Sequence, residues 1–481
     1  MAELLHPRME SYGRLADKSD LSCEANHMDE RTRKLVTAPV FWLLGALAAP
    51  NLLVMITQTA VGLVEVYFLA RLGVDVLAGV SSVFPILALI TALSQGAMGG
   101  GISAAVSRSL GRGQVKEAGD VVWYACGIAI VLGAATTLLL LICGPAIYRS
   151  MGADGSSLAA ATEYSDFMFS GAILIWLFNA LLSIVRGTGN MILPMKIVCG
   201  GAVLLVPVSP LLIFGVGPMP GVGIVGGAAA ILIYYSIGSV CFALYLRRGN
   251  SVLRPTLRPP HVDWKRVWEI LNVGGLSALV SISTNVTIAF VTGFVGSHGV
   301  GAVAGYGAAS RLEFFLVPLS FGIGGPAGVI IGTNIGAGCL DRALRFAWVS
   351  ALAAGVLAEG IGLLAAGYPE VWLKEFSTNQ AALAAGTAYL RSVGPFFGLF
   401  GIGFALYCAS QGIGKMGWPL AGAFLRSAVA IIGGMAATSM EDVFTAVAVG
   451  MAAFGSVCAV GMVCNGYRMR RSMGQGNGRM P

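Results

Sequence analysis

Residues 186–194 read Arg-Gly-Thr-Gly-Asn-Met-Ile-Leu-Pro, and residues 411–419, which lie 225 positions later, read Gln-Gly-Ile-Gly-Lys-Met-Gly-Trp-Pro. Within one residue of that offset, two more pairs of segments align in the same order: 73–79 with 299–305, and 110–113 with 335–338. Three ordered matches at one offset indicate that the chain contains two copies of one structural unit. The fold is therefore expected to repeat itself.

Long apolar runs fill both copies. Of the 481 residues, 56% are hydrophobic and only 11% are charged, whereas a soluble domain carries roughly 25% charged residues. The composition therefore excludes a soluble enzyme, and runs of about 20 residues or more are long enough to cross a membrane as helices. Treating the polar interruptions as loops predicts twelve helices, near residues 40–70, 78–107, 119–146, 158–186, 191–215, 221–246, 267–296, 301–335, 342–366, 380–410, 417–437 and 442–467.

The number of runs in each copy predicts the architecture. Six helices precede the polar stretch 247–266 and six follow it, so both copies enter the membrane from the same side. We predict an all-α integral membrane protein with twelve transmembrane helices in two parallel-repeat six-helix lobes, a class in which the substrate site lies between the lobes. Its expected parts are a disordered cytoplasmic tail (1–38), an N-terminal lobe (39–246), a cytoplasmic linker (247–266), a C-terminal lobe (267–467) and a second cytoplasmic tail (468–481).

Basic residues predict the orientation. When loops are assigned alternately to the two sides, 24 of the 30 Lys and Arg residues fall on the side of the N-terminus. Only Arg71, Arg149 and Lys374 fall on the other side, and three more lie inside apolar runs. Positive residues gather in cytoplasmic loops, so we expect both termini in the cytoplasm and the protein in the cytoplasmic (plasma) membrane. The net charge of +7 then follows from topology, and no nucleic-acid partner is expected.

Several motifs lie in the predicted helices and turns. Residues 58–65 read Gln-Thr-Ala-Val-Gly-Leu-Val-Glu, residues 210–215 read Pro-Leu-Leu-Ile-Phe-Gly, and residues 332–338 read Gly-Thr-Asn-Ile-Gly-Ala-Gly. Together with the 186–194 motif, their order and spacing resemble the multidrug and toxic compound extrusion (MATE) family over about residues 39–467. The resemblance implies a V-shaped pair of six-helix lobes that exports organic, usually cationic, compounds in exchange for protons or sodium.

Acids inside apolar runs are functional candidates, because a charge at the bilayer centre costs at least about 2.5–3.5 kcal/mol. Glu65 lies in an apolar stretch near the outer end of the first helix. Its counterpart in the family is an acid used in ion coupling, here one methylene longer than the usual Asp. Our main hypothesis is that Glu65 takes up a proton outside and releases it inside. The alternative is that Glu65 extends to the outer interface of the membrane.

The second lobe contains Arg311 and Glu313, which are two positions apart and so face different sides of a helix. Glu313 is a candidate for ion coupling or substrate binding. Alternatively, it forms a structural buried pair with a residue such as Arg426. Of the remaining acids, Glu163 and Asp166 are expected at the outer interface. The sequence leaves the role of Glu359 undecided and favours a structural one.

Polar side chains complete the candidate site. Gln58 lies two helical turns before Glu65 on the same face, and Asn179 matches a cavity-facing Asn of the family. Ser209 stands where some members carry an acid. The expected substrate or cavity residues are Gln58, Asn179, Ser209, Asn285, Tyr306 and Arg311.

The coupling ion is predicted by comparing the acidic residues of this chain with those of the family that it resembles. Some family members carry acids in the stretches that correspond to 280–290 and 395–410, and this chain has none there. Hard cations prefer several oxygen ligands, carboxylates included, whereas a single Glu suffices for a proton. The pattern therefore favours proton over sodium coupling, and no cofactor is expected.

These features predict a monomeric secondary active antiporter that exports organic, usually cationic, drugs or toxic compounds in exchange for protons or sodium by alternating access. The expected partners are these small molecules and the membrane lipids around the protein. A flippase for lipid-linked precursors, from the same broad superfamily, is the alternative, but only three basic residues lie within apolar runs. A passive channel is less consistent with two duplicated lobes and no filter-like loop. An enzyme is not expected, because the sequence shows no nucleophile–base pair, metal cluster or phosphate loop.

Overall fold

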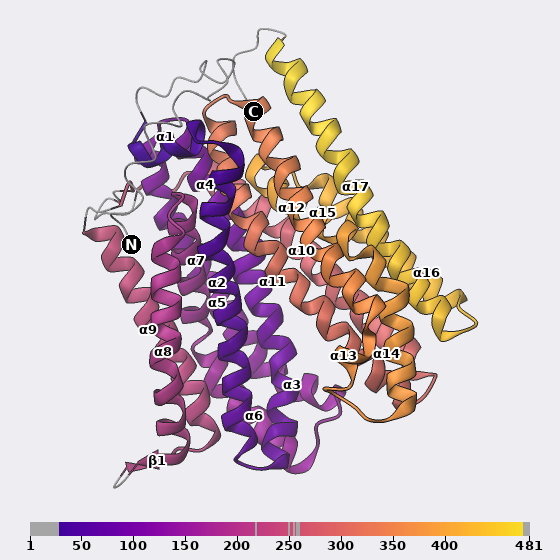
Figure 1. Cartoon of the computed structure of the whole chain (residues 1–481). Helices are drawn as coiled ribbons and strands as arrows, with labels where there is room; N and C mark the ends of the chain where they lie inside the picture. Colours follow the sequence, from indigo (N-terminus) through magenta and orange to yellow (C-terminus); the bar gives the residue numbers. More distant parts are fainter. Residues whose placement is uncertain (1–27, 217–218, 249–250, 254, 256–259, 475–481) are drawn as a thin grey trace.

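The computed structural model describes residues 28–216, 219–248, 251–253, 255 and 260–474 (Figure 1). The described elements are almost all helices, with one two-stranded hairpin between α8 and α9. Their bounds are α1 (Glu30–Thr37), α2 (Val40–Ala70), α3 (Val74–Thr91), the π-helix η5 (Ala92–Met98), α4 (Gly99–Gly111), α5 (Val115–Ser150), α6 (Gly155–Ser170), α7 (Ala172–Gly187), α8 (Ile192–Phe214), β1 (Gly215–Val216), β2 (Met219–Pro220), α9 (Ile224–Arg247), α10 (Trp264–Gly296), α11 (Val300–Gly336), α12 (Leu340–Gly367), α13 (Pro369–Leu373), α14 (Gln380–Val393), the 3-10 helix η6 (Gly394–Phe396), α15 (Phe397–Ile413), α16 (Gly417–Ala436) and α17 (Met440–Gly474).

These elements form the predicted membrane bundle. Within the described residues, eleven helical segments are long and apolar enough to span a membrane, and the pair α6–α7, which bends by 50°, provides a twelfth. Two of the eleven are composite, since η5 joins α3 to α4 and η6 joins α14 to α15. The prediction of twelve transmembrane helices is confirmed, although some ends differ by a few residues: the second span begins at Val74 rather than near residue 78.

The two halves of the chain lie side by side, with the earlier helices on the left of Figure 1 and the later ones on the right. Both α1 and the end of α17 lie at the same end of the bundle, which we call the tail side. The opposite end, where the β1–β2 hairpin lies, is the far side. Each half has an even number of spans, so the start of α2 and the end of α17 lie on the same side.

The repeated motifs form turns that need glycine. Gly113 and Gly338 have φ angles of 73° and 79°, and Gly189 and Gly414 have φ angles of 77° and 84°. The members of each pair are 225 positions apart, and each lies just after a helix end. Residues with a side chain avoid this left-handed region, so the turns on the tail side require glycine at these repeated positions.

Each half has its own hydrophobic core, but the cores exchange helix ends. Leu43 and Leu44, at the start of α2, belong to the core formed mainly by α10–α17. Conversely, Val267 and Ile270, at the start of α10, belong to the core formed mainly by α2–α9. The first helix of each lobe therefore begins in the other lobe, and this exchange ties the lobes together on the tail side.

The end of the N-terminal tail differs from the expectation of disorder over residues 1–38. Residues 30–37 form α1, whose first turn is capped by Asp29 accepting from Arg31 N at 3.0 Å. Leu35 is buried, and its carbonyl accepts from Asn334 Nδ2 of α11 at 3.2 Å. The tail is so rich in charged residues that its composition predicts disorder. The Asp29 cap and the buried side chains of Leu35 and Val36 nevertheless allow one helix to form against α11. Residues 1–27 lie outside the described residues.

Candidate functional site

Glu65 lies inside the N-terminal lobe, where α2, α8 and α9 meet. Its side chain is 0% exposed, and Ser209 Oγ of α8 donates to its Oε2 at 2.9 Å. On the other side, a Cβ at Gly227 of α9 would collide with Oε1. The carboxyl therefore occupies a space that exists because residue 227 is glycine. A side chain with no exposed surface does not extend to the outer interface, contrary to the alternative.

The carboxyl of Glu65 is only half satisfied. Among the described residues, Oε1 has no hydrogen-bond partner, and no Lys or Arg forms an ion pair with Glu65. The hydroxyl of Tyr164 on α6 is also buried without a partner and interacts electrostatically with Glu65. A buried acid that lacks a cation is costly when charged, so this site is suited to binding a proton.

A second polar group lies around η5. Gln95 Nε2 donates to Gln58 Oε1 at 3.2 Å, and Asn179 Nδ2 donates to Ser94 Oγ at 2.8 Å. The structure thus brings Gln58 and Asn179 to one π-helical turn. Sequence reasoning missed Ser94 and Gln95, although π-helical turns in α-helices often occur at functional sites. The apolar run that contains them gives no signal for the extra residue in the turn.

Glu313 forms the buried structural pair that the sequence left as one of two alternatives. Arg426 Nη2 of α16 donates to Glu313 Oε1 at 2.9 Å, and Tyr389 Oη of α14 donates to Oε2 at 2.6 Å. The ring of Tyr306 packs edge-on against that of Tyr389, with centroids 5.2 Å apart. Three helices of the C-terminal lobe are joined here, and the carboxylate already has a cation.

The structure does not bring Arg311 or Asn285 into either acid site. Arg311 is exposed, and its guanidinium lies 5.2 Å from the ring centroid of Phe376. Asn285 is also exposed and donates to Ser281 O at 2.9 Å. Among the described residues, no hydrogen bond joins either side chain to Glu65 or Glu313.

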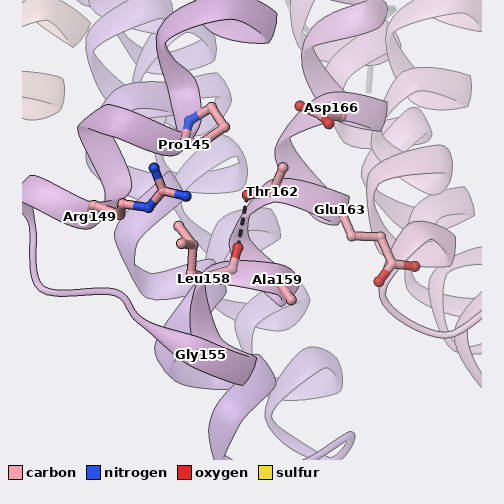
Figure 2. Close-up of a pocket in the computed structure, with 8 residues that line it drawn as sticks. All are labelled: Pro145, Arg149, Gly155, Leu158, Ala159, Thr162, Glu163 and Asp166. Atoms are coloured by element: carbon pink, nitrogen blue, oxygen red, sulfur yellow. Dashed lines mark hydrogen bonds between the residues drawn. The ribbon is translucent and has the colours of Figure 1, made fainter.

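Glu163 and Asp166 line a pocket between the far-side ends of α5 and α6 (Figure 2). The pocket has a volume of about 560 Å³ and is also lined by Arg149, which points across it toward α6. Glu359 accepts from the backbone N–H of Gly398 at 2.7 Å. Because Gly398 is in the first turn of α15, this contact satisfies a helix end that the break at η6 exposes.

A seam of contacts joins the lobes on the tail side. Arg108 of α4 donates to the carbonyls of Gln411 and Gly412 at 3.2 and 2.8 Å and forms an ion pair with Glu269 at 2.8 Å. Gln411 in turn donates to Gly96 O of the first lobe at 3.0 Å. These bonds close the tail side of the interface between the lobes. In the sequence, Arg108 is simply one of the 24 basic residues on the side of the N-terminus, and the pattern does not indicate this role.

The repeat brings equivalent residues together in the seam. Gly111 and Gly336, which are 225 positions apart, lie against each other, and a Cβ on Gly336 would be 3.0 Å from the Cα of Gly111. The same residue of each copy therefore lies in the contact between α4 and α11, and glycine permits this close approach.

Arg186 is a further buried charge in this region. Its side chain is 5% exposed, and within the part of the chain that the structure describes its Nε and Nη2 have no hydrogen-bond partner. Its guanidinium faces the ring of Phe321 in the other lobe at 5.8 Å. Its repeat counterpart is Gln411, which makes a hydrogen bond across the same seam. Separation of the lobes on the tail side would therefore uncover Arg186.

Twelve spans in two duplicated lobes, a buried acid without a cation and a seam between the lobes define a multi-pass membrane transporter. A family model described as MatE matches residues 50–211 and 277–435. The chain belongs to this family of multidrug efflux transporters.

Curated relatives cover most of the chain. A protein named FAD transporter from Shewanella oneidensis is 28% identical over 312 residues, which are 64% of this chain and 68% of that protein. The multidrug export protein MepA of Staphylococcus aureus is 24% identical over 406 residues, 84% of this chain and 88% of that protein.

Solved structures share the fold. A MATE protein in its straight conformation superposes with a TM-score of 0.83 at 22% identity, covering 92% of this chain and 100% of that one. An outward-facing multidrug resistance MATE transporter gives 0.81 at 21% identity, with the same coverage of both chains. At these identities the likeness concerns architecture alone.

Proposed function

We propose that this protein is a proton-coupled antiporter that exports organic cations by alternating access of its two lobes. The observation that carries the proposal is the state of Glu65, a fully buried carboxyl that has one hydrogen bond and no cation within the described residues. Intramembrane acids of this kind mark proton and substrate pathways. Small-molecule export is also what the printed name of the MepA relative states for that protein.

The surroundings of Glu65 support a proton as the coupling ion. Its one hydrogen-bond partner is the hydroxyl of Ser209, and Gly227 contributes no side-chain oxygen. Within the described part of the chain, no cluster of three or more His, Cys, Asp or Glu residues could hold a metal ion. Hard cations need several oxygen ligands, so one carboxylate and one hydroxyl make a weak sodium site and a sufficient proton site.

The positive-inside rule supports a cytoplasmic tail side and the plasma membrane as location. The bonds of Arg108 and Gln411 would then close the cytoplasmic side and leave the opposite side to open. In this state Glu65 takes up a proton from outside. Because its carboxyl contacts α8 and α9, loss of the charge changes the packing of those helices within the lobe. Export follows when the seam opens, cytoplasmic substrate binds and the proton leaves inward.

The test is transport in proteoliposomes with an imposed pH gradient, with ethidium as substrate. Wild type accumulates the dye against its gradient. Glu65→Gln, which cannot change charge, loses pH-driven transport, whereas Glu313→Gln, if folded, retains it. A Glu65→Gln protein that still couples dye movement to the pH gradient contradicts the proposal. A sodium gradient replaces the pH gradient in a parallel arm, and we expect no transport there.

A second candidate function is export of organic anions that carry phosphate or carboxylate groups. The buried guanidinium of Arg186 favours it, since a charge without a carboxylate partner inside a membrane protein is a functional candidate. Guanidinium groups bind phosphate in a bidentate manner, and one relative is named FAD transporter. Transport of riboflavin and of riboflavin 5′-phosphate tests it, because the two differ only by the phosphate. Arg186→Gln, which copies residue 411, is expected to abolish phosphate-dependent transport and to leave ethidium efflux intact.

A further inference from the structure

A lateral groove runs between α8 and α9 on the surface of the N-terminal lobe. It has a volume of about 310 Å³ and is lined mainly by apolar side chains, with Lys196 near one end and Val208 near the other. Gly200 and Gly201 both line the groove. A Cβ on Gly200 would meet no atom within 4 Å, whereas a Cβ on Gly201 would collide with the ring of Tyr234. The space beside Gly200 is therefore open.

The length of the groove matches one leaflet. Twelve residues separate Lys196 from Val208 on α8, which corresponds to about 18 Å along a helix. Half of a hydrocarbon core of about 30 Å is about 15 Å. The groove therefore extends from the tail-side headgroup region to about the membrane centre, the depth reached by one acyl chain of one leaflet.

Charge distinguishes the two ends. Lys196 is exposed, and among the described residues it forms no ion pair with a carboxylate. The deep end contains only apolar residues, such as Leu204, Leu205 and Val208. A ligand that fits both ends has an anionic head and a single chain extending from it, and it reaches the site from within the bilayer.

We propose that this groove is a specific binding site for an anionic phospholipid of the leaflet on the tail side, with one acyl chain between α8 and α9 and the phosphate beside Lys196. The site lies behind the helix pair that holds Glu65: Val208 precedes Ser209, and Ala230 lies about one turn beyond Gly227. A chain bound there supports the packing of α8 against α9. The inference requires the membrane orientation proposed above and does not depend on the transported substrate.

Two variants and a matched control test the site. Gly200→Leu fills the groove, and since residue 200 has open space around it, the substitution leaves the protein's own packing intact. Gly293→Leu is the control, because Gly293 is likewise an exposed helical glycine with nothing within 4 Å, but it lies on α10 away from the groove. Lys196→Gln removes the charge and leaves the groove open.

The measurement is native mass spectrometry of purified protein titrated with phosphatidylglycerol or phosphatidylcholine of identical chains. Wild type and Gly293→Leu retain one phosphatidylglycerol in preference to phosphatidylcholine. Gly200→Leu loses this lipid. Lys196→Gln lowers the preference about fivefold, the factor that corresponds to about 1 kcal/mol per basic residue near an anionic lipid.

A thermal melt provides a second measurement that does not depend on retention in the gas phase. A ligand that binds only the folded state raises the melting temperature, so phosphatidylglycerol raises it for wild type and Gly293→Leu but not for Gly200→Leu. Equal lipid retention and equal stabilisation in all four proteins overturn the proposal. If Glu65→Gln loses coupled transport and still retains the lipid, the lipid site stands independently of the proposed function.

Discussion

The two lobes treat a buried acid in opposite ways. In the N-terminal lobe, Glu65 has one hydroxyl donor and no cation within the described residues. In the C-terminal lobe, Glu313 has Arg426 at 2.9 Å and Tyr389 at 2.6 Å. The tyrosines near the two acids, Tyr164 and Tyr389, are 225 positions apart and therefore occupy the same place in the repeat.

In the proposed function, this difference separates the acid that takes part in ion coupling from the acid that joins three helices of the second lobe. The cation beside Glu313 stabilises the carboxylate, so removing one partner leaves an uncompensated buried charge. Glu65 has no such partner among the described residues, so a proton bound there would break no ion pair. Both lobes have a buried tyrosine at the same place in the repeat, but among the described residues only Glu313 has a basic partner, Arg426.

The largest expected effect follows from breaking the pair in the C-terminal lobe. Arg426→Met leaves Glu313 buried and unpaired, so the free energy of unfolding should fall by about 3–5 kcal/mol. Unfolding in mixed detergent micelles measures it. The double variant Glu313→Leu with Arg426→Met should recover most of the loss, because it removes both charges, and Glu65→Gln should stay within about 1 kcal/mol of wild type. Equal losses from Glu65→Gln and Arg426→Met would contradict the distinction between the lobes.

The next effect concerns the fit of Glu65 against α9. Gly227→Ala places a methyl group on Oε1, and overpacking of this kind costs about 1–3 kcal/mol. We expect loss of pH-driven transport together with that destabilisation. Shortening the acid should restore the space, so Glu65→Asp combined with Gly227→Ala should transport better than Gly227→Ala alone. If Glu65→Asp does not restore transport to Gly227→Ala, the loss does not come from a collision between residue 227 and the Glu65 carboxyl.

A smaller effect is expected from Ser209→Ala. The hydroxyl hydrogen bond favours the charged carboxylate, so its removal lets Glu65 keep its proton to higher pH. The pH at which transport is half-maximal should rise by about one unit, which corresponds to about 1.4 kcal/mol. The matched change Ser283→Ala, in a hydroxyl cluster of the C-terminal lobe with Ser427 at 2.6 Å, should leave the pH profile unchanged. If the pH of half-maximal transport falls in Ser209→Ala, the Ser209 hydrogen bond does not favour the charged form of Glu65.

The smallest effects come from the paired tyrosines. Tyr389→Phe removes a hydrogen bond to Glu313 and should cost about 1 kcal/mol of stability, without changing the pH dependence of transport. Tyr164→Phe should leave stability nearly unchanged, because its hydroxyl has no hydrogen-bond partner to lose. Thermal melts and pH profiles of transport compare the two variants directly. A larger loss of stability for Tyr164→Phe than for Tyr389→Phe would contradict the conclusion that only the Tyr389 hydroxyl contributes a hydrogen bond.

Much of the fold follows from the sequence because a membrane imposes simple rules. Apolar runs give the twelve spans, and the offset between 186–194 and 411–419 gives the two lobes. The positive φ angles of Gly189 and Gly414 explain why those motifs persist in both copies. The helix α1 was missed, since a short amphipathic segment within a charged tail forms only when a partner buries Leu35.

The site is less predictable because it depends on contacts between distant segments. An acid in an apolar run marks both Glu65 and Glu313, but which of them meets an Arg depends on how α11 packs near α16. Arg108 looks like an ordinary loop charge in the sequence, and only the structure shows it bonded to carbonyls of the other lobe. Arg311 and Asn285 are exposed because of the way their helices are rotated about their own axes. In a helix that is apolar on nearly every face, the sequence pattern does not predict that rotation.

Proton release upon substrate binding tests the role of Glu65 most directly. Purified protein in weakly buffered detergent solution is mixed with ethidium, and a pH indicator dye records released protons with and without sodium. We predict release from wild type and from Glu313→Gln, independent of sodium, and no release from Glu65→Gln. Undiminished release from Glu65→Gln, or release that requires sodium, would contradict the assignment of Glu65 as the proton-coupling acid.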